Sequence, residues 1–201
     1  MDWEKLERKL KYKGYEVSRF ATGKEAAAYL DGKIDGVTVG FGDSETMISM
    51  GLYDLLAKHN DVADPKHPKE GKDFYSTARD ALITDIFLTS VNGMAETGEM
   101  VNIDGTGNRV AGSLFGHRKV YFVVPVNKIV PTLDDAIWRA RNVAAPKNTA
   151  RHHYHTPCAA KQDHCYDCNS PDRICCAQTI YWRKMRNIES EIVLIDEELG
   201  F

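Results

Sequence analysis

Hydrophobic and polar positions along the chain follow two alternating patterns. Short apolar runs, which are typical of strands buried in a sheet, occur at residues 37–42, 85–88, 119–126, 179–182 and 192–195. Apolar positions with helical spacing predict helices at residues 3–13, 47–55, 75–82 and 132–143. Capping-box patterns at Thr22 and Thr132 indicate two helix starts. This alternation of strands and helices predicts an α/β fold, with a mostly parallel sheet and helices on both of its faces.

The stretch from Thr89 to Arg109 follows a predicted strand and places polar side chains between glycines. Ligands of an open α/β sheet collect beyond the carboxyl ends of its strands, so residues 92–99 are expected to face that rim. The chain is expected to leave the parallel sheet here in an antiparallel excursion. The turn at residues 102–109 is expected to close over residues 92–99. The candidate catalytic residues are Glu96, Glu99 and Asn92, with the two carboxylates as base or nucleophile. The ligand-binding candidates in this stretch are Thr97, Gly98, Asp104, Asn108 and Arg109.

Two alternatives stay open for this stretch. Asn92, Asp104 and Asn108 could instead satisfy the backbone of turns, as Asn and Asp side chains often do. Arg109 has the planar donors that bind a carboxylate or phosphate through two hydrogen bonds, but an ordinary salt bridge would explain it equally well.

A second candidate site is the turn that follows the strand at residues 37–42. Gly40, Gly42, Asp43 and Ser44 join this strand to a helix, an arrangement that offers backbone N–H groups to an anion. The G-x-G-x-x-G spacing of dinucleotide-binding turns is absent. The alternative is a plain strand-to-helix turn. Residues 40–44 and residues 89–99 each follow a predicted strand directly, so both are expected to lie on the same rim.

Composition narrows the class of protein. With 201 residues, 43% hydrophobic and 27% charged, the chain suits one globular domain spanning residues 1–201. A net charge of −3 gives no reason to expect nucleic acid as a partner. The charged N-terminus is unlike a signal peptide, and the longest apolar run, residues 120–126, is too short to span a membrane. The expected location is the cytoplasm.

All five cysteines lie within a Cys-rich segment at residues 152–176, which also holds four histidines. The spacing Cys158-x6-Cys165-x2-Cys168-x6-Cys175 places four thiols close enough in sequence to wrap one metal. Four thiolates suit either zinc or a [4Fe–4S] cluster, and a histidine could replace one of them. Free or redox-labile thiols are the alternative. An odd number of clustered cysteines argues against a secreted, disulfide-bonded protein.

Several segments resemble the lactate-utilisation (LUD, formerly DUF162) family, which includes proteins of the LutC/YkgG type. The resemblance rests on N-G-M-A-E-T-G at residues 92–98 and V-N-I-D-G-T-G-N-R-V at residues 101–110. It extends to A-R-D-A-L at 78–82, N-V-A-A-P-K-N at 142–148 and S-P-D-R-I-C at 170–175, and so covers nearly the whole chain. It implies a Rossmann-like sheet of the NagB/RpiA/CoA-transferase kind and a bacterial protein tied to the oxidation of lactate or similar acids. Related enzymes use a carboxylate, and by that analogy the role falls to Glu96.

Two functions are consistent with these observations. In the first, the chain acts on or senses a small organic acid or a phosphorylated metabolite. In the second, it is a non-catalytic, metal-binding accessory subunit of an oxidoreductase complex, with an iron–sulfur oxidoreductase as its partner. The sequence leaves open whether the protein is an enzyme and whether it forms a homodimer.

Overall fold

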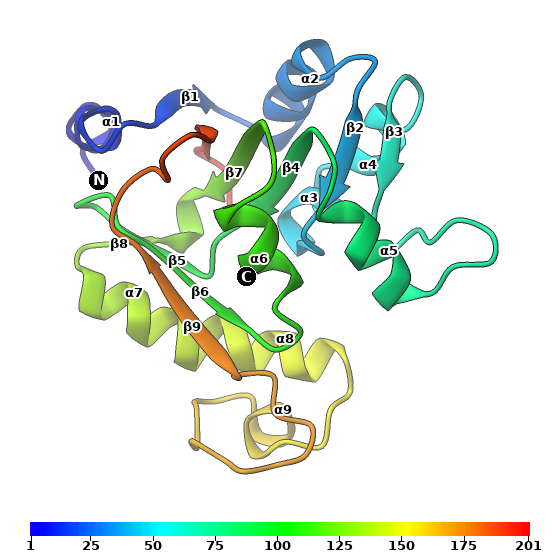
Figure 1. Cartoon of the computed structure of the whole chain (residues 1–201). Coiled ribbons are helices and arrows are strands. Elements are labelled where there is room, and N and C mark those ends of the chain that lie inside the picture. The colour runs from blue at the N-terminus through cyan, green and yellow to red at the C-terminus, as the bar shows by residue number, and fades with distance from the viewer.

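The computed structural model describes residues 1–201, which form helices packed on two β-sheets (Figure 1). The helical elements are α1 (Trp3–Tyr12), α2 (Gly23–Lys33), α3 (Glu45–Ser49), α4 (Leu52–Leu56), α5 (Phe74–Ala81), α6 (Asn108–Leu114), the 3-10 turn η1 (Val126–Lys128), α7 (Leu133–Arg139), the π-helical turn η2 (Ala140–Ala144), α8 (Ala145–Arg151) and α9 (Pro157–Lys161). The strands are β1 (Glu16–Phe20), β2 (Thr38–Phe41), β3 (Asp61–Ala63), β4 (Ile86–Ser90), β5 (Gly93–Ala95), β6 (Met100–Asp104), β7 (Lys119–Pro125), β8 (Ile129–Val130), β9 (Ala177–Tyr181) and β10 (Glu189–Ile195).

The larger sheet has the strand order β1-β10-β7-β4-β2-β3, and all its neighbouring strands are parallel. Its central strands β4, β7 and β10 are the apolar runs of the sequence, and they are buried almost throughout because helices cover both faces. This confirms the α/β, Rossmann-like fold. None of the helices combines the length and the apolarity that crossing a bilayer requires.

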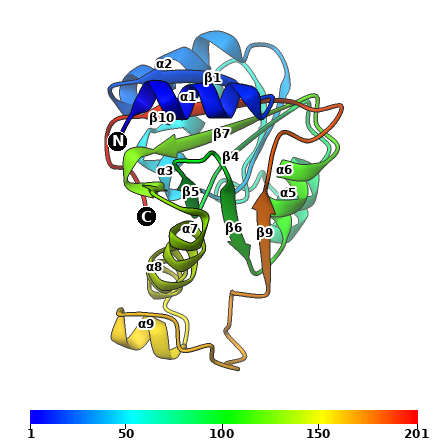
Figure 2. The same cartoon turned by 90° about the vertical axis from the view of Figure 1, so that its left-hand side faces the viewer.

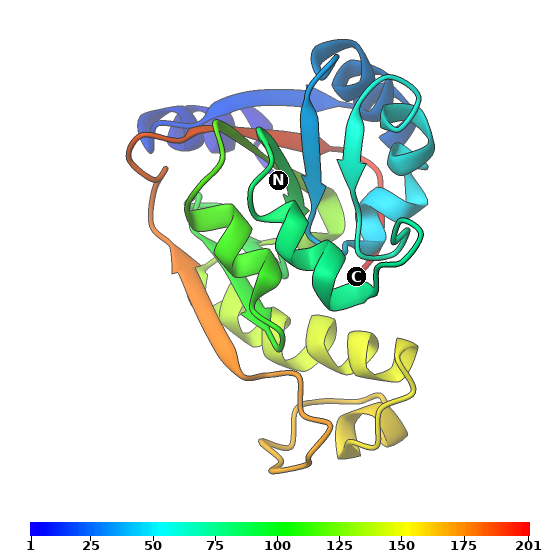
Figure 3. The same ribbon diagram turned by 45° about the vertical axis from the view of Figure 1, so that its right-hand side comes forward.

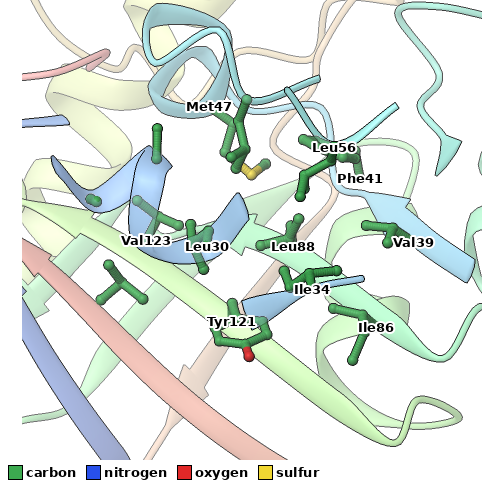
Figure 4. Close-up of a cluster of buried hydrophobic side chains, with 14 of the residues drawn as sticks. Leu30, Ile34, Val39, Phe41, Met47, Leu56, Ile86, Leu88, Tyr121 and Val123 are labelled. Carbon is green, nitrogen blue, oxygen red and sulfur yellow. The ribbon is translucent and has the colours of Figure 1, made fainter. Parts of the chain in front are cut away.

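Two hydrophobic cores lie on opposite faces of this sheet. On one face, Leu30 of α2, Met47 of α3 and Leu56 of α4 pack against Leu88 and other strand residues (Figure 4). On the other face, α1 and α5 pack over the sheet together with side chains from β5, β6 and β9. The apolar spacing of these helices therefore places each of them on a core, and the central strands are fixed from both sides.

The smaller sheet has the order β8-β5-β6-β9 and packs beneath the second core (Figure 2). Strands β5 and β6 form an antiparallel hairpin, and β6 also pairs in antiparallel fashion with β9, whose residues lie about 75 positions later. Helix α7 covers its other face. The expected antiparallel excursion is present, but its hairpin turn is at residues 96–99. The loop after Asp104 enters α6 instead.

Two helices depart from the expected lengths. The apolar stripe at residues 47–55 is divided between α3 and α4, because Gly51 takes a left-handed backbone conformation with φ 62°. The helix that starts after Thr132 continues through the π-helical turn η2 into α8, so it extends to Arg151. Helix α8 thereby reaches below the loop that leads from β6 to α6 (Figure 3).

Candidate functional site

A cavity of about 400 Å³ opens beside the carboxyl ends of β2 and β3. The end of β2, the start of α5, the loop after β6 and helix α8 come together around it (Figure 3). Its lining residues are Asp43, Lys66, Phe74, Tyr75, Ile103, Asp104, Gly105, Thr106, Asn108, Arg109, Asn148, His152, Tyr154 and Ile174. The position beyond strand ends is where open α/β sheets bind their ligands.

Asp43 lies directly after β2 and carries two unusual features. Its backbone is left-handed, with φ 49°, a conformation that costs a residue other than glycine free energy. Its Oδ1 atom is buried and accepts no hydrogen bond, although Lys66 Nζ lies 3.6 Å away. Oδ2 lies 3.8 Å from Nη2 of Arg151. A strained residue with a buried, unsatisfied carboxylate oxygen beside a cavity is typical of a functional position.

Two cationic side chains line the cavity together with Asp43. Lys66 follows β3, and Arg109 begins α6; both line the cavity. Arg109 donates one hydrogen bond from Nη2 to the carbonyl oxygen of Ile103 at 2.6 Å, and the same nitrogen lies 3.9 Å from Asp104 Oδ1. Asp104 Oδ2 accepts the backbone N–H of Val110 at 3.0 Å and so holds the start of α6. The remaining guanidinium donors of Arg109 can bind a carboxylate or phosphate.

His152 contributes an imidazole that stays neutral near pH 7. Burial lowers its pKa first, and the nearby charges of Arg151 and Lys66 lower it further. Its Nε2 atom lies 2.8 Å from Nη2 of Arg151, so Nε2 accepts a hydrogen bond and Nδ1 carries the proton. The ring stacks on Tyr154 with a centroid distance of 5.4 Å. The cavity therefore combines a fixed neutral imidazole with two carboxylates and two cations.

The other residues of the turn after β2 have structural contacts. A Cβ on Gly42 would lie 2.9 Å from Thr89 Oγ1 and 3.2 Å from Arg109 Cγ, so glycine is needed for close packing there. Gly40 lies within β2 against the end of α5. Ser44 is buried at the N-cap of α3 without a side-chain capping bond. It lines a smaller cavity of about 110 Å³ that shares Asp43 and Lys66 with the larger one.

The expectation that residues 92–99 face the same rim is wrong for residues 96–99. Glu96, Thr97, Gly98 and Glu99 form the β5–β6 turn, at the opposite end of β6 from Asp104 and roughly 15 Å away along the strand. This turn lies against α1, where Lys9 Nζ donates to the backbone oxygen of Glu96 at 3.3 Å. None of the four residues lines the cavity. The hairpin reverses the chain immediately after β5, which carries Glu96 away from the strand ends.

Glu99 has a specific partner in α1. Its Oε1 accepts a hydrogen bond from Lys13 Nζ at 2.7 Å, and Oε2 accepts one from Thr97. Burial raises the pKa of Glu99, but the hydrogen bonds from Lys13 and Thr97, a backbone hydrogen bond and the charge of Lys13 together lower it. Gly98 adopts φ 91°, as the tight turn requires. This carboxylate therefore ties the hairpin to α1.

Asn92 bridges strands β5 and β6. Its Oδ1 accepts the backbone N–H of Ile103 at 2.7 Å, and its own N–H donates to Oδ1 of Asn102 at 3.0 Å. Asn92 does not line the cavity, whereas Asp104, Asn108 and Arg109 do. The second half of the stretch, expected to close over the site as a structural turn, thus supplies lining residues of the cavity.

Sequence reasoning missed Lys66, Asn148 and His152. Lys66 lies in a loop without periodicity, and only the short strand β3 before it places it at the rim. Asn148 lies in α8 and His152 is the C-cap of that helix, which the sequence pattern did not extend past residue 143. The segment N-V-A-A-P-K-N at residues 142–148 was the available signal for Asn148, and His152 was counted only among the histidines of the Cys-rich segment.

The Cys-rich segment includes α9 and the loops on either side of it. All five cysteines are free: Cys158 is buried, Cys165, Cys168 and Cys175 are partly buried, and Cys176 is exposed. No three His, Cys, Asp or Glu side chains of the chain stand together in an arrangement that could hold a metal ion. Burial first, and then the neighbouring thiols of Cys165 and Cys158, raise the pKa of Cys175 to about 11.

Comparison with known proteins gives two matches. The family model of the LUD domain matches residues 3–195. The chain is also similar to the crystal structure of a DUF162 family protein from Deinococcus radiodurans, with a TM-score of 0.52 and 13% sequence identity over 96% of this chain and 95% of that chain. At this identity the likeness establishes the fold alone. No curated protein matches the sequence.

Proposed function

We propose a function from the premise that this chain belongs to the LUD domain family: it binds a small organic acid or a phosphorylated metabolite in the cavity at the ends of β2 and β3. Membership in this family supports a role related to lactate utilisation. The observation that carries the proposal is the buried Oδ1 of Asp43, which has no hydrogen-bond partner and lies beside Lys66 at the cavity.

The cavity supports this class of ligand by its charges and its size. Lys66 and Arg109 offer donors to an anionic carboxylate or phosphate. The carboxylate of Asp43, which lines the cavity, can accept a hydrogen bond from a hydroxyl group, the group that distinguishes a hydroxy acid from a simple anion. A volume of about 400 Å³ lies at the lower end of ordinary ligand sites, and it suits a small molecule better than a nucleotide.

Proton transfer is the chemistry that the lining residues could add. The carboxylate of Asp43 and the neutral imidazole of His152 both line the cavity; the carboxylate can take a proton from a bound hydroxyl group, and Nδ1–H of His152 can donate a hydrogen bond. The catalytic role suggested for Glu96 stays a prediction. Because Glu96 does not line the cavity, it is not part of the site proposed here.

The test is a thermal-shift screen of the purified protein followed by calorimetric titration. The panel contains lactate, glycolate, pyruvate, glycerol phosphate and inorganic phosphate, and a ligand that binds the folded state raises the unfolding temperature. We expect Lys66→Met to weaken binding about tenfold or more, because a charge-assisted hydrogen bond contributes roughly 1.5–3 kcal/mol. Asp43→Asn should weaken binding of hydroxy acids more than that of phosphate.

Two variants serve as controls. Lys58→Met removes an exposed cation outside the cavity and should leave the affinity unchanged. Glu96→Gln should also leave it unchanged. A panel in which no compound raises the unfolding temperature, or a Lys66→Met variant that binds as tightly as the unaltered protein, would overturn the proposal. Loss of binding in Glu96→Gln would place the ligand at the hairpin instead.

A further inference from the structure

A buried aspartate and a histidine form a hydrogen-bonded pair at the carboxyl end of β3. Asp64 follows this strand directly and is only 4% exposed, and its Oδ2 lies 2.8 Å from Nδ1 of His67. Because a carboxylate accepts hydrogen bonds, Nδ1 carries the proton, and the neutral ring has its lone pair on Nε2. His67 therefore differs from His152, whose Nε2 already accepts a hydrogen bond from Arg151.

Three further contacts fix this pair. Asp64 Oδ1 accepts the backbone N–H of Lys66 at 3.0 Å, and the backbone N–H of His67 donates to the backbone oxygen of Asp64 at 2.8 Å. The imidazole ring stacks on Tyr53 of α4, with a centroid distance of 3.8 Å and an angle of 11° between the two planes. A buried carboxylate that sets the tautomer and the orientation of an imidazole is the arrangement in which catalytic histidines act on a substrate.

The ring of His67 remains accessible to a ligand. Its side chain is 45% exposed, and it lines the smaller cavity of about 110 Å³ together with Asp64. Lys66 and Asp43 line this cavity as well as the larger one. Strands β2 and β3 are parallel neighbours, so the turns that follow them lie side by side. Lys66 thus adjoins two hydrogen-bond acceptors: Asp43, whose Oδ1 lies 3.6 Å from its Nζ, and His67, the next residue.

We propose that the ligand of this site is an acid with hydroxyl groups on two neighbouring carbons, and that Nε2 of His67 accepts a hydrogen bond from the second hydroxyl group. This assignment rests on the proposed function, in which Lys66 binds the carboxylate and Asp43 accepts the first hydroxyl group. The second hydroxyl group then enters the smaller cavity. A volume of about 110 Å³ exceeds the roughly 30 Å³ that one water molecule occupies in the liquid, so a hydroxymethyl group fits there. Asp64 is a positioning residue, because it acts on the ligand only through the ring of His67.

Such a site distinguishes acids by their hydroxyl groups. Lactate has the first hydroxyl group and lacks the second, so it offers no partner to Nε2 of His67. A site that hydrogen-bonds a hydroxyl group rejects an analogue without it, because a polar group of the protein then loses its partner. Since His67 is half exposed, water can replace the missing group, and the difference in affinity is limited to about tenfold.

Calorimetric titration of the full chain with glycerate, lactate and inorganic phosphate tests this assignment. We expect glycerate to bind about tenfold more tightly than lactate. His67→Phe keeps an aromatic ring against Tyr53, and in this variant glycerate should bind no more tightly than lactate. The affinities for lactate and phosphate should stay within about twofold of their original values. His59→Phe is the matched control, because His59 also pairs with aspartates, Asp35 at 2.9 Å and Asp31 at 2.8 Å, but lines neither cavity; it should keep the preference for glycerate.

A second measurement does not depend on the folding of any variant. Nitrogen-15 NMR of the unaltered protein at pH 8 identifies which ring nitrogen of His67 carries the proton. We expect the Nδ1–H tautomer without ligand, and a change in the Nε2 resonance when glycerate is added but not when lactate is added. Asp64→Ala removes the acceptor that fixes the ring proton, so both tautomers should be populated in that variant.

The outcomes distinguish this assignment from the proposed function. If lactate and phosphate bind but glycerate binds no more tightly than lactate, the assignment of the second hydroxyl group is wrong and the proposed function stands. An unchanged preference in His67→Phe, an Nε2–H tautomer in the ligand-free protein, or an Nε2 resonance that glycerate does not shift would also overturn it. If none of the three compounds binds, the proposed function fails, and the assignment fails with it.

Discussion

Substituting Gly40 tests whether this glycine binds a ligand or permits packing. Gly40 lies in β2, where a Cβ atom would come 2.7 Å from Thr84 Oγ1 and 3.1 Å from the carbonyl carbon of Ala81, and closer still to the oxygen of that carbonyl. Ala81 ends α5, so two of these three atoms are backbone. Rotation of a side chain cannot relieve the contact. In Gly40→Ala, strand β2 and helix α5 must therefore move apart.

The expected cost follows from two opposing effects. Overpacking of a buried contact costs roughly 1–3 kcal/mol of unfolding free energy. Replacing glycine by alanine returns about 0.4–1 kcal/mol, because the unfolded chain loses conformational freedom. We expect Gly40→Ala to destabilise the protein by about 1–2 kcal/mol, measured by urea unfolding with an unchanged m-value. Its affinity for the cavity ligand should stay the same.

Gly32→Ala is the matched control. Gly32 lies in the last turn of α2, and a Cβ there would meet no atom within 4 Å. The same substitution should therefore stabilise the protein, by about 0.5–1 kcal/mol, through helix propensity. If Gly40→Ala were as stable as the unaltered protein but bound the ligand more weakly, the packing argument would be refuted and the ligand-binding role first expected for Gly40 would stand.

Two further predictions concern buried titratable groups. His117 is buried with its Nε2 unpartnered, and burial lowers its pKa despite the hydrogen bond to the oxygen of Thr84. In the unfolded chain this histidine binds a proton more readily, so the free energy of unfolding should fall as the pH drops below about 6.5. His117→Gln should reduce that fall. Urea midpoints that stay equal from pH 7 to pH 5 for both proteins would contradict this prediction. Burial, then Arg139 and Arg109, lower the pKa of Lys128 well below its usual value. Stability should therefore rise as the pH increases toward about 10.4, because the unfolded lysine still binds a proton that the folded lysine has lost. Lys128→Met should flatten this rise, and an unchanged slope in the variant would count against the assignment.

The parts of the fold that depend on local pattern were predictable. Strands β4, β7 and β10 are apolar runs, which burial on both faces requires. The start of α7 at Thr132 is a reciprocal capping box in the structure, with Thr132 Oγ1 accepting the N–H of Asp135 at 3.1 Å. Local hydrogen-bonding chemistry and the period of the apolar positions contain this information without reference to the rest of the chain.

The smaller sheet was not predictable in the same way. Strand β6 pairs on one side with β5, its neighbour in sequence, and on the other with β9, which follows the whole Cys-rich segment. Such a pairing depends on side chains that meet only in the folded chain, among them Met94, Met100 and Tyr181 in the second core. Periodicity within β6 alone contains no sign of that partner.

The location of the cavity shows both what the sequence pattern could predict and what it could not. In an open α/β sheet, ligands bind beyond the carboxyl ends of the strands. This rule correctly places Asp43 in the lining of the cavity. The same rule fails for Glu96, because it applies to a chain that leaves the sheet for a helix, whereas the chain after β4 enters the smaller sheet. Residues 104–109 return to the rim only because β6 runs antiparallel to β5 and ends beside α8. Because β6 reverses the direction of the chain, the second half of the polar stretch at residues 89–109 reaches the cavity instead of the first half. The residues of this stretch that line the cavity are therefore Asp104, Asn108 and Arg109.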